Sequence, residues 1–247
     1  MMSAYLRALA SLESWSLGGD GLEPEILEAY REAAKCLASM RAKRIRVLDV
    51  GAGGGGDLRY IRRSLDEAQL SLRSVEVVAV EPNRCTWSCV EREQKRWLPQ
   101  IAGFQLLPSM PESSPEGFDM AVLQHVLCCA ERPENLLCDV QKALRPGGQL
   151  VFVEHVLADS SQMPYLRTAQ AALRSVQMAV CNGCDPCRDT ERLFEGQLFE
   201  EVKLKRFNLP VLGVQIPHIK GVAVKRESDP PVALRGPLTP ATLREFL

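Results

Sequence analysis

Short, largely apolar runs alternate with segments of helical periodicity through the middle of the chain. The runs are rich in β-branched residues, which is typical of strands buried on both faces of a sheet. The expected strands are Ile45–Val50, Val75–Val80, Phe104–Leu107, Phe118–Leu123 and Gln149–Glu154. The expected helices between them are Asp57–Asp66, Cys85–Trp97 and Pro133–Leu144. This alternation predicts a parallel sheet with helices on both faces, joined by right-handed crossovers.

The pattern changes after Glu154. A helical stripe covers Leu166–Val180, and a short helix is expected around Thr190–Glu195. Two consecutive strands follow, Phe199–Phe207 and Gln215–Lys225, which suits an antiparallel hairpin. The chain is therefore expected to be an α/β protein with a doubly wound, Rossmann-like, seven-stranded sheet, mostly parallel with a C-terminal antiparallel hairpin.

The same pattern divides the chain into three parts. Residues 1–44 are expected to form helices packed on the domain, the second of them starting at Pro24, where a proline costs no hydrogen bond. Residues 45–225 are expected to form the main domain, with an insert at about residues 156–197. Residues 226–247 are rich in proline and poor in apolar residues, and are expected to be a flexible tail.

Composition narrows the class of protein. The 30 basic and 31 acidic residues leave a net charge of −1, which gives no electrostatic argument for a nucleic-acid partner. No run approaches the roughly 20 apolar residues of a membrane-spanning helix, and the N-terminus does not read as a secretory signal. The nine cysteines of so long a chain favour a reducing compartment. A cytoplasmic protein is expected, and the pattern leaves its oligomeric state open.

A glycine-rich turn follows the first expected strand. It reads Val47-Leu48-Asp49-Val50-Gly51-Ala52-Gly53-Gly54-Gly55-Gly56-Asp57. Glycines between a strand and a helix let the backbone bend tightly and let a ligand lie against it. The same pattern is shared with dinucleotide folds, in which a pyrophosphate rests on the helix N-terminus. Asp49 argues against that alternative, because its charge repels a pyrophosphate but can receive an amino group.

Two further motifs bear on the ligand. Glu81-Pro82-Asn83 ends the second strand, where a carboxylate can accept both hydroxyls of a ribose. Phe118-Asp119 opens the fourth strand, and Leu144-Arg145-Pro146-Gly147-Gly148 precedes the fifth. With these pieces, residues 45–155 resemble the class I methyltransferases that depend on S-adenosylmethionine (SAM).

This resemblance implies that SAM is the cofactor. It implies that the glycine turn holds the methionine part, that the carboxylate after the second strand holds the ribose, and that residues after the third strand flank the adenine. The implied cofactor-binding residues are Asp49, Gly51, Gly53, Gly55, Glu81, Pro82, Met110, Pro111 and Gln124.

A narrower resemblance covers about residues 47–225, and is to the methyltransferase-like proteins that methylate alkyl thiols. The matching pieces include Val126-Leu127-Cys128, Glu154-His155-Val156, Gly183-Cys184 and Pro217-His218-Ile219. The resemblance implies transfer to a small, apolar acceptor, an alkyl thiol among the choices, with the insert as its lid. Methylation of oxygen, nitrogen or carbon on a lipid, quinone or natural product is the second interpretation. A SAM-fold protein that binds a partner without turnover is the third.

The histidines are the candidate proton acceptors. Methyl transfer from a sulfonium needs alignment and exclusion of water, and it needs a base only if the acceptor must lose a proton. His125 and His155 follow the fourth and fifth strands, at the edge where open α/β sheets bind ligands, and are the candidate catalytic residues. His218 opens the last strand. The alternative for each is a hydrogen-bonded structural histidine.

Cys181, Cys184 and Cys187 form a C-x-x-C-x-x-C run, a spacing that can ligate zinc or an iron–sulfur cluster. A tetrahedral site needs a fourth ligand, and no second C-x-x-C accompanies the run. Plain loop cysteines near the substrate are the favoured interpretation, and no metal is assigned. Cys128 and Cys129 are interpreted as buried packing residues.

Overall fold

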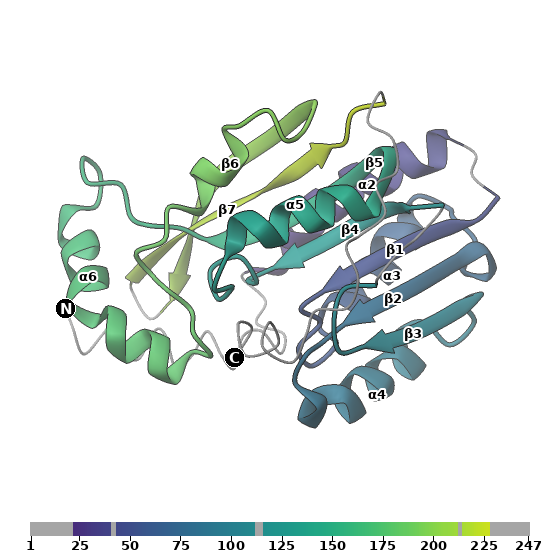
Figure 1. Cartoon of the computed structure of the whole chain (residues 1–247), viewed down its shortest axis with the longest axis horizontal. Helices are drawn as coiled ribbons and strands as arrows, with labels where there is room; N and C mark the ends of the chain where they lie inside the picture. Colours follow the sequence, from purple (N-terminus) through teal and green to yellow (C-terminus); the bar gives the residue numbers. More distant parts are fainter. Residues whose placement is uncertain (1–21, 41–42, 112–115, 212–213, 228–247) are drawn as a thin grey trace.

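A single seven-stranded sheet forms the centre of the molecule (Figure 1). The computed structural model describes residues 22–40, 43–111, 116–211 and 214–227. The sheet has the order β3-β2-β1-β4-β5-β7-β6. Its strands are β1 (Ile45–Val50), β2 (Val75–Val80), β3 (Gly103–Leu107), β4 (Phe118–Gln124), β5 (Leu144–His155), β6 (Glu201–Val211) and β7 (Val214–Val224). The strands β1 to β5 are parallel, and β7 is antiparallel to both of its neighbours. The predicted mixed sheet is confirmed.

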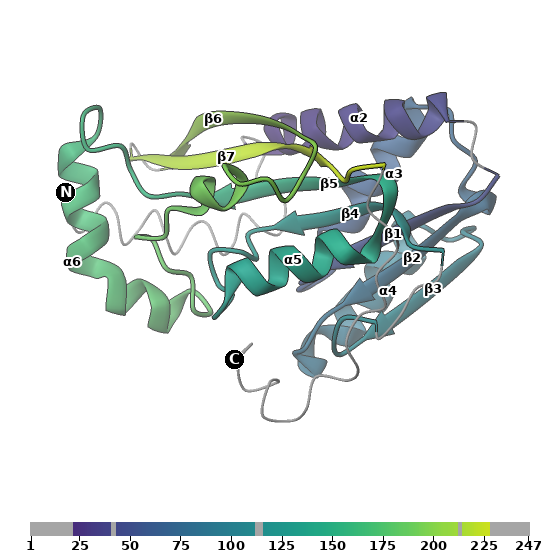
Figure 2. The same cartoon turned by 45° about the horizontal axis from the view of Figure 1, so that its top comes forward.

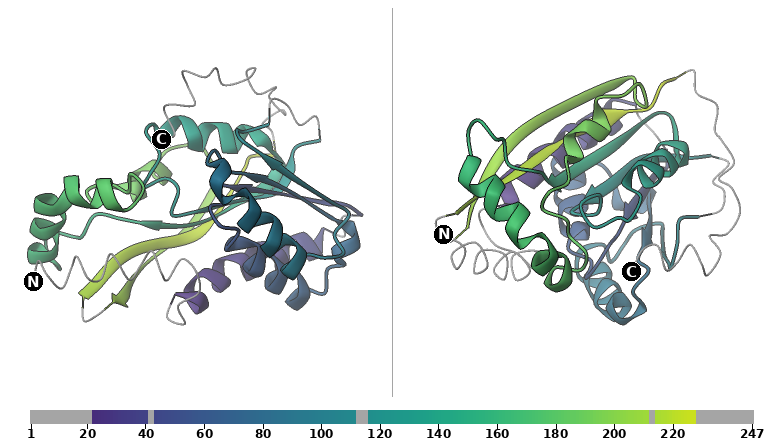
Figure 3. Two further views of the ribbon diagram at one scale, coloured as in Figure 1. Left: turned by 90° about the horizontal axis from the view of Figure 1, so that it is seen from below. Right: turned by 60° about the vertical axis from the view of Figure 1, so that its left-hand side comes forward.

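Helices cover both faces of this sheet (Figure 3). The helices α2 (Glu23–Ser39), α3 (Asp57–Glu67) and α4 (Trp87–Trp97) contribute to one apolar core, and α5 (Pro133–Ala143) contributes to the other. Phe152 and Phe194 stack in the second core with their ring centroids 4.0 Å apart. Because apolar layers lie on both faces, the central strands contain almost no exposed positions.

The helix α6 (Pro164–Val180) extends beyond the sheet, at the end where β5 and the β6–β7 hairpin project (Figures 1 and 2). Leu173 is buried, whereas Val176 and Val180 are 45% and 57% exposed. Gln170 ties the helix to the domain, because its Oε1 accepts a hydrogen bond from the amide of Ala158 at 2.9 Å. None of the helices in the described ranges has the length and hydrophobicity that crossing a bilayer requires.

Several predicted boundaries shift in the structure. The strand expected from Gln149 begins at Leu144, because Leu144 already pairs with Phe118 before the register shifts. The segment from Arg145 to Gly148 is therefore an irregular entry to β5 rather than a turn outside it. The helix expected from Cys85 begins with a 3₁₀ turn at Arg84–Thr86. The helix expected in residues 1–19 and most of the expected tail lie outside the described residues.

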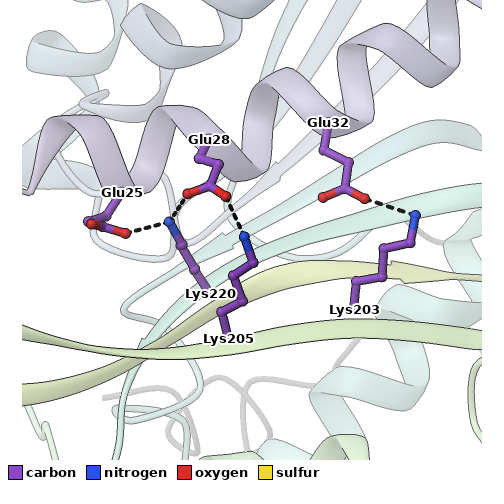
Figure 4. A network of polar contacts seen from close by, with 6 residues as sticks. All are labelled: Glu25, Glu28, Glu32, Lys203, Lys205 and Lys220. Atoms are coloured by element: carbon purple, nitrogen blue, oxygen red, sulfur yellow. Dashed lines mark hydrogen bonds and ion pairs between the residues drawn. The ribbon is translucent and has the colours of Figure 1, made fainter.

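The helix α2 is bound to the C-terminal hairpin by a row of ion pairs (Figure 4). The Nζ of Lys220, on β7, contacts the carboxylates of Glu25 and Glu28. On β6, Lys205 contacts Glu28 at 2.7 Å and Lys203 contacts Glu32 at 2.9 Å. Hydrogen bonds from Lys205 and Lys220 lower the pKa of Glu28 to about 2. Of the three lysines only Lys220 is buried, since its side chain is 5% exposed.

We expect Lys220→Met to reduce the free energy of unfolding by about 1–3 kcal/mol, because a charge-assisted contact to two carboxylates is lost at a buried position. Lys203→Met is the matched control. Its side chain is 59% exposed, so the loss should stay within about 1 kcal/mol. Urea unfolding followed by circular dichroism measures both changes. Equal losses in the two variants would show that burial of Lys220 does not strengthen its ion pairs.

Candidate active site

The glycine turn connects β1 to α3 at the carboxyl edge of the sheet. Gly51 has φ +73°, and a Cβ there would lie 2.6 Å from Cγ2 of Val126. Gly55 has φ +86°, and a Cβ would lie 3.1 Å from Cα of Val90 on α4. Both positions have a left-handed backbone that would strain a side chain, and at Gly51 a Cβ would also clash with Val126. The turn consequently lies directly against the segment that follows β4.

Asp49 lies inside the molecule behind this turn. The residue is fully buried, and neither of its carboxylate oxygens has a hydrogen-bond partner among the described residues. Burial raises the pKa of Asp49, and the neighbouring carboxylate of Asp57 raises it further. A buried carboxylate beside a second one is costly without a cation. The arrangement therefore fits a ligand that brings a positively charged group, such as an amino group, to the turn.

Glu81 lies next to the same turn from the end of β2. Its Oε2 accepts a hydrogen bond from the amide of Gly53 at 2.7 Å, and its Oε1 accepts one from the amide of Asn83 at 2.7 Å. The indole of Trp87 donates to the carbonyl of Glu81 at 2.9 Å. The structure thus brings the glycine turn and the acidic strand end together, and each carboxylate oxygen keeps a second lone pair for a hydroxyl donor.

The other expected cofactor residues lie along the same edge. Pro82 follows Glu81, and Met110 and Pro111 follow β3. Met110 packs against the second core. Gln124 is the last residue of β4, and its Oε1 is buried with no hydrogen-bond partner in the ranges that the structure describes. These positions meet at one edge because β1 to β4 are parallel neighbours.

Three histidine rings are packed together at this edge, although they are far apart in the sequence. The ring centroids of His125 and His155 are 4.3 Å apart and nearly parallel. The ring of His218 lies 4.5 Å from His155 and 5.4 Å from His125. The Nε2 atom of each histidine is buried and has no hydrogen-bond partner among the described residues. The third member, His218, arrives through the antiparallel register that pairs it with His155.

The three rings differ in protonation. Burial and the neighbouring His155 lower the pKa of His125 to about 3. Burial also lowers the pKa of His218, whose Nδ1 lies 2.9 Å from the carbonyl of Ile216. Burial opposes the charged form of His155 as well, but the neighbouring Cys184 outweighs it and raises the pKa. Two of the three imidazoles are therefore neutral near pH 7, with lone pairs available.

Two cysteine sulfurs lie on the other side of His155. Its Nδ1 is 3.4 Å from Sγ of Cys184 and 3.7 Å from Sγ of Cys128. Cys128 is fully buried and Cys184 is 4% exposed. The C-x-x-C-x-x-C run contributes only Cys184 here, since Cys181 and Cys187 join neither of the two ligand clusters found in the described part of the chain. The sequence alone indicated that Cys128 is a packing residue, and its contact with His155 was not predicted.

Glu154 fixes the loop that carries these groups. Its Oε1 accepts hydrogen bonds from the amides of Val126 and Leu127 at 2.9 and 3.0 Å, and its Oε2 accepts one from the amide of Cys128 at 3.2 Å. Burial raises the pKa of this carboxyl to about 7 against the effect of the three amides. The side chain points at the loop after β4, so its role is to position that loop.

The insert closes over the same loop. The guanidinium of Arg188 donates to the carbonyls of Leu127 and Ala130, the first at 2.6 Å. Arg174 on α6 makes a two-pronged ion pair with Asp185 at 2.9 and 2.6 Å. The amide of Asp185 donates to the carbonyl of Cys128 at 2.9 Å. These contacts place the loop after α6 against the histidines.

Comparison with known proteins agrees with this geometry. A family model described as a methyltransferase domain matches residues 25–200. Human thiol S-methyltransferase TMT1A is 34% identical over 108 residues, which are 43% of this chain and 43% of that protein, so this match spans less than half of the relative. Rat thiol S-methyltransferase TMT1B is 27% identical over 187 residues, which are 73% of this chain and 71% of that protein.

Solved structures share the fold. The DszA carbon methyltransferase superposes with a TM-score of 0.60 at 17% identity, over 89% of this chain and 58% of that one. The YcgJ protein of Bacillus subtilis superposes with a TM-score of 0.52 at 14% identity, over 80% and 99%. The family model spans most of the chain, and the buried Asp49, which has no partner in the described part of the chain, fits the cationic amino group of SAM. The chain therefore belongs to the SAM-dependent methyltransferases.

Proposed function

We propose that this methyltransferase acts on the sulfur of a small, apolar thiol. The observation that supports this most directly is the cluster of three histidines and two buried cysteines beside the glycine turn. Its soft, buried surroundings suit a thiol better than a hydrophilic acceptor. The relatives named above are thiol S-methyltransferases with 27–34% identity, so the similarity and the chemistry of the site point the same way.

On the cofactor side, we assign a role to each predicted residue. Asp49 binds the amino group, Glu81 binds the ribose hydroxyls, and the remaining residues contact the methionine chain and the adenine. The remaining residues are Gly51, Gly53, Gly55, Pro82, Met110, Pro111 and Gln124. When bound, SAM supplies an activated methyl group on a sulfonium, and the protein aligns the acceptor and excludes water.

On the acceptor side, His125 accepts a hydrogen bond from the thiol and His155 holds the ring of His125 in place. Burial keeps His125 neutral, its ring stacks on His155, and its buried Nε2 has no partner among the described residues. An alkyl thiol has a pKa of about 8.5, so modest help produces enough thiolate. The insert at residues 156–197 acts as the lid, since Arg188 and Asp185 hold it against the loop after β4.

A panel of acceptors tests this function. The full chain is incubated with methyl-labelled SAM and, separately, an alkanethiol, a phenol, a primary amine and a carbon acid of similar size. We expect label in the thiol alone, and a loss of at least tenfold in His125→Asn with SAM binding unchanged. The variant Asp66→Asn, on the exposed side of α3, should match the wild type.

Other outcomes assign a different function. Label in the phenol, amine or carbon acid with an unlabelled thiol would show that the chain is an O-, N- or C-methyltransferase. Normal SAM binding without transfer to any acceptor would favour a binding protein that does not turn over. Thermal unfolding with and without SAM separates that result from loss of the cofactor.

A further inference from the structure

Two cysteine sulfurs and one imidazole nitrogen meet beneath the proposed acceptor site. We propose that Cys128, His155 and Cys184 bind one Zn²⁺ ion. The three ligand atoms all lie within 4.8 Å of one another. They come from three separate segments, namely the loop after β4, the end of β5 and the loop after α6. Two thiolates and an imidazole form a ligand set that zinc prefers.

The separations match a tetrahedral zinc site. Zinc bonds to sulfur at about 2.3 Å and to nitrogen at about 2.0–2.1 Å, which places the two ligand atoms about 3.6 Å apart at a tetrahedral angle. The measured separations from Nδ1 of His155 are 3.4 Å to Cys184 and 3.7 Å to Cys128. Both are within about 0.2 Å of that value. The two sulfurs also lie within 4.8 Å of each other, so the three ligands can close on an ion.

The surroundings hold each ligand in place. Glu154 fixes the amide of Cys128, and the carbonyl of Cys128 accepts the amide of Asp185, so the two cysteine loops are joined. The side-chain amide of Gln177, on α6, donates to Sγ of Cys184 at 3.4 Å. Metal sites need such outer contacts to orient their ligands. A sulfur that accepts an amide hydrogen also carries negative charge more easily.

Charge and hydrogen bonding also balance when the ion is present. Two thiolates neutralise a divalent cation, which suits a buried position. With the ion on Nδ1, the remaining proton of neutral His155 sits on Nε2, beside the tilted ring of His218. The Nε2 of His218 is buried and has no hydrogen-bond partner among the described residues. The ion thus accounts for the two cysteines that lie against His155.

Three protein ligands leave one tetrahedral position open. If the proposed thiol methylation is correct, this position takes the acceptor sulfur, since zinc stabilises a thiolate near neutral pH. Binding of the ion itself does not depend on that function. The C-x-x-C-x-x-C spacing suggested a different set, but Cys181 and Cys187 lie outside this cluster.

Cobalt titration of the full chain tests the site. The protein is reduced with a phosphine, stripped of metal under argon and titrated with Co²⁺. We expect one equivalent to produce the visible bands of a tetrahedral site together with sulfur-to-cobalt charge transfer, and Zn²⁺ to abolish both. Cys128→Ser and Cys184→Ser should each weaken cobalt binding at least tenfold. Cys36→Ser and Cys138→Ser, free cysteines elsewhere, are matched controls.

Circular dichroism and SAM binding confirm that each variant is folded. Absence of charge transfer in the reduced wild type, or its retention in both cluster variants, would overturn the site. Dependence on His125 and His218 but not on the cysteines would assign the ion to the three-histidine cluster instead. A Cys128–Cys184 disulfide in protein that binds no cobalt after reduction would replace the metal site with a redox pair. None of these readouts requires methyl transfer, so failure of the thiol assay leaves them interpretable.

Discussion

Asp49→Asn is expected to weaken SAM binding about 100-fold. The carboxylate is fully buried and has no partner within the described residues, so the amino group of the ligand becomes its counter-charge. Loss of one member of a buried charge pair costs about 2–5 kcal/mol, and each 1.4 kcal/mol is a factor of ten in affinity. Isothermal titration calorimetry measures the change. Asp66→Asn on the exposed surface of α3 is the control and should bind as the wild type does.

The same variant should not destabilise the cofactor-free protein. Burial and Asp57 raise the pKa of Asp49 above its value in the unfolded chain. For an acid shifted in this direction, ionisation costs stability as the pH rises above the unfolded-state value. Asparagine removes that cost, so thermal unfolding without SAM should occur at the same temperature or higher near pH 7. Wild-type affinity, or loss of affinity only through unfolding, would contradict the assignment of Asp49 to the cofactor.

Glu154→Ala is expected to reduce the free energy of unfolding by about 3 kcal/mol or more. The amides of Val126, Leu127 and Cys128 would lose their acceptor, the last two at buried positions, and each unsatisfied buried donor costs about 1–3 kcal/mol. Denaturant unfolding gives the number. Methyl transfer should fall as well, because the loop that carries His125 is no longer held.

Glu154→Gln separates hydrogen bonding from charge. The amide oxygen of glutamine can still accept from Val126 and Leu127, and only the bond from Cys128 is lost. We expect less than half the destabilisation of the alanine variant. Equal losses would show that the charge of Glu154, rather than its hydrogen bonds with the three amides, carries the effect.

The cofactor half of the site could be predicted from the sequence because it is built locally. Asp49 and Gly53 lie on one strand–helix turn, and Glu81 ends the next strand of a parallel pair. Adjacent parallel strands bring such ends together without further information. The hydrogen bond from the amide of Gly53 to Glu81 follows directly from that rule.

The cluster proposed as the acceptor site could not be predicted in the same way, because it depends on long-range register. Cys128 and Cys184 come together only after the insert folds back onto the loop after β4. His218 meets His155 because β7 pairs with β5 in one particular antiparallel register. A shift of one residue would turn His218 to the opposite face. Neither the C-x-x-C-x-x-C spacing nor the apolar run around Cys128 predicts that these side chains come into contact.

The position of β7 within the sheet has a consequence for how the chain folds during synthesis. It is the last strand of the sheet in sequence, yet it lies between β5 and β6. Until residues 214–224 have left the ribosome, β5 has an open edge and β6 has no strand to pair with. When β7 inserts, His218 comes into contact with His155, and Lys220 forms its ion pairs with α2, which is far away in the sequence. Late, non-local pairing of this kind is slow, so this order of synthesis leaves the edge of β5 open to wrong strand pairing until β7 is in place.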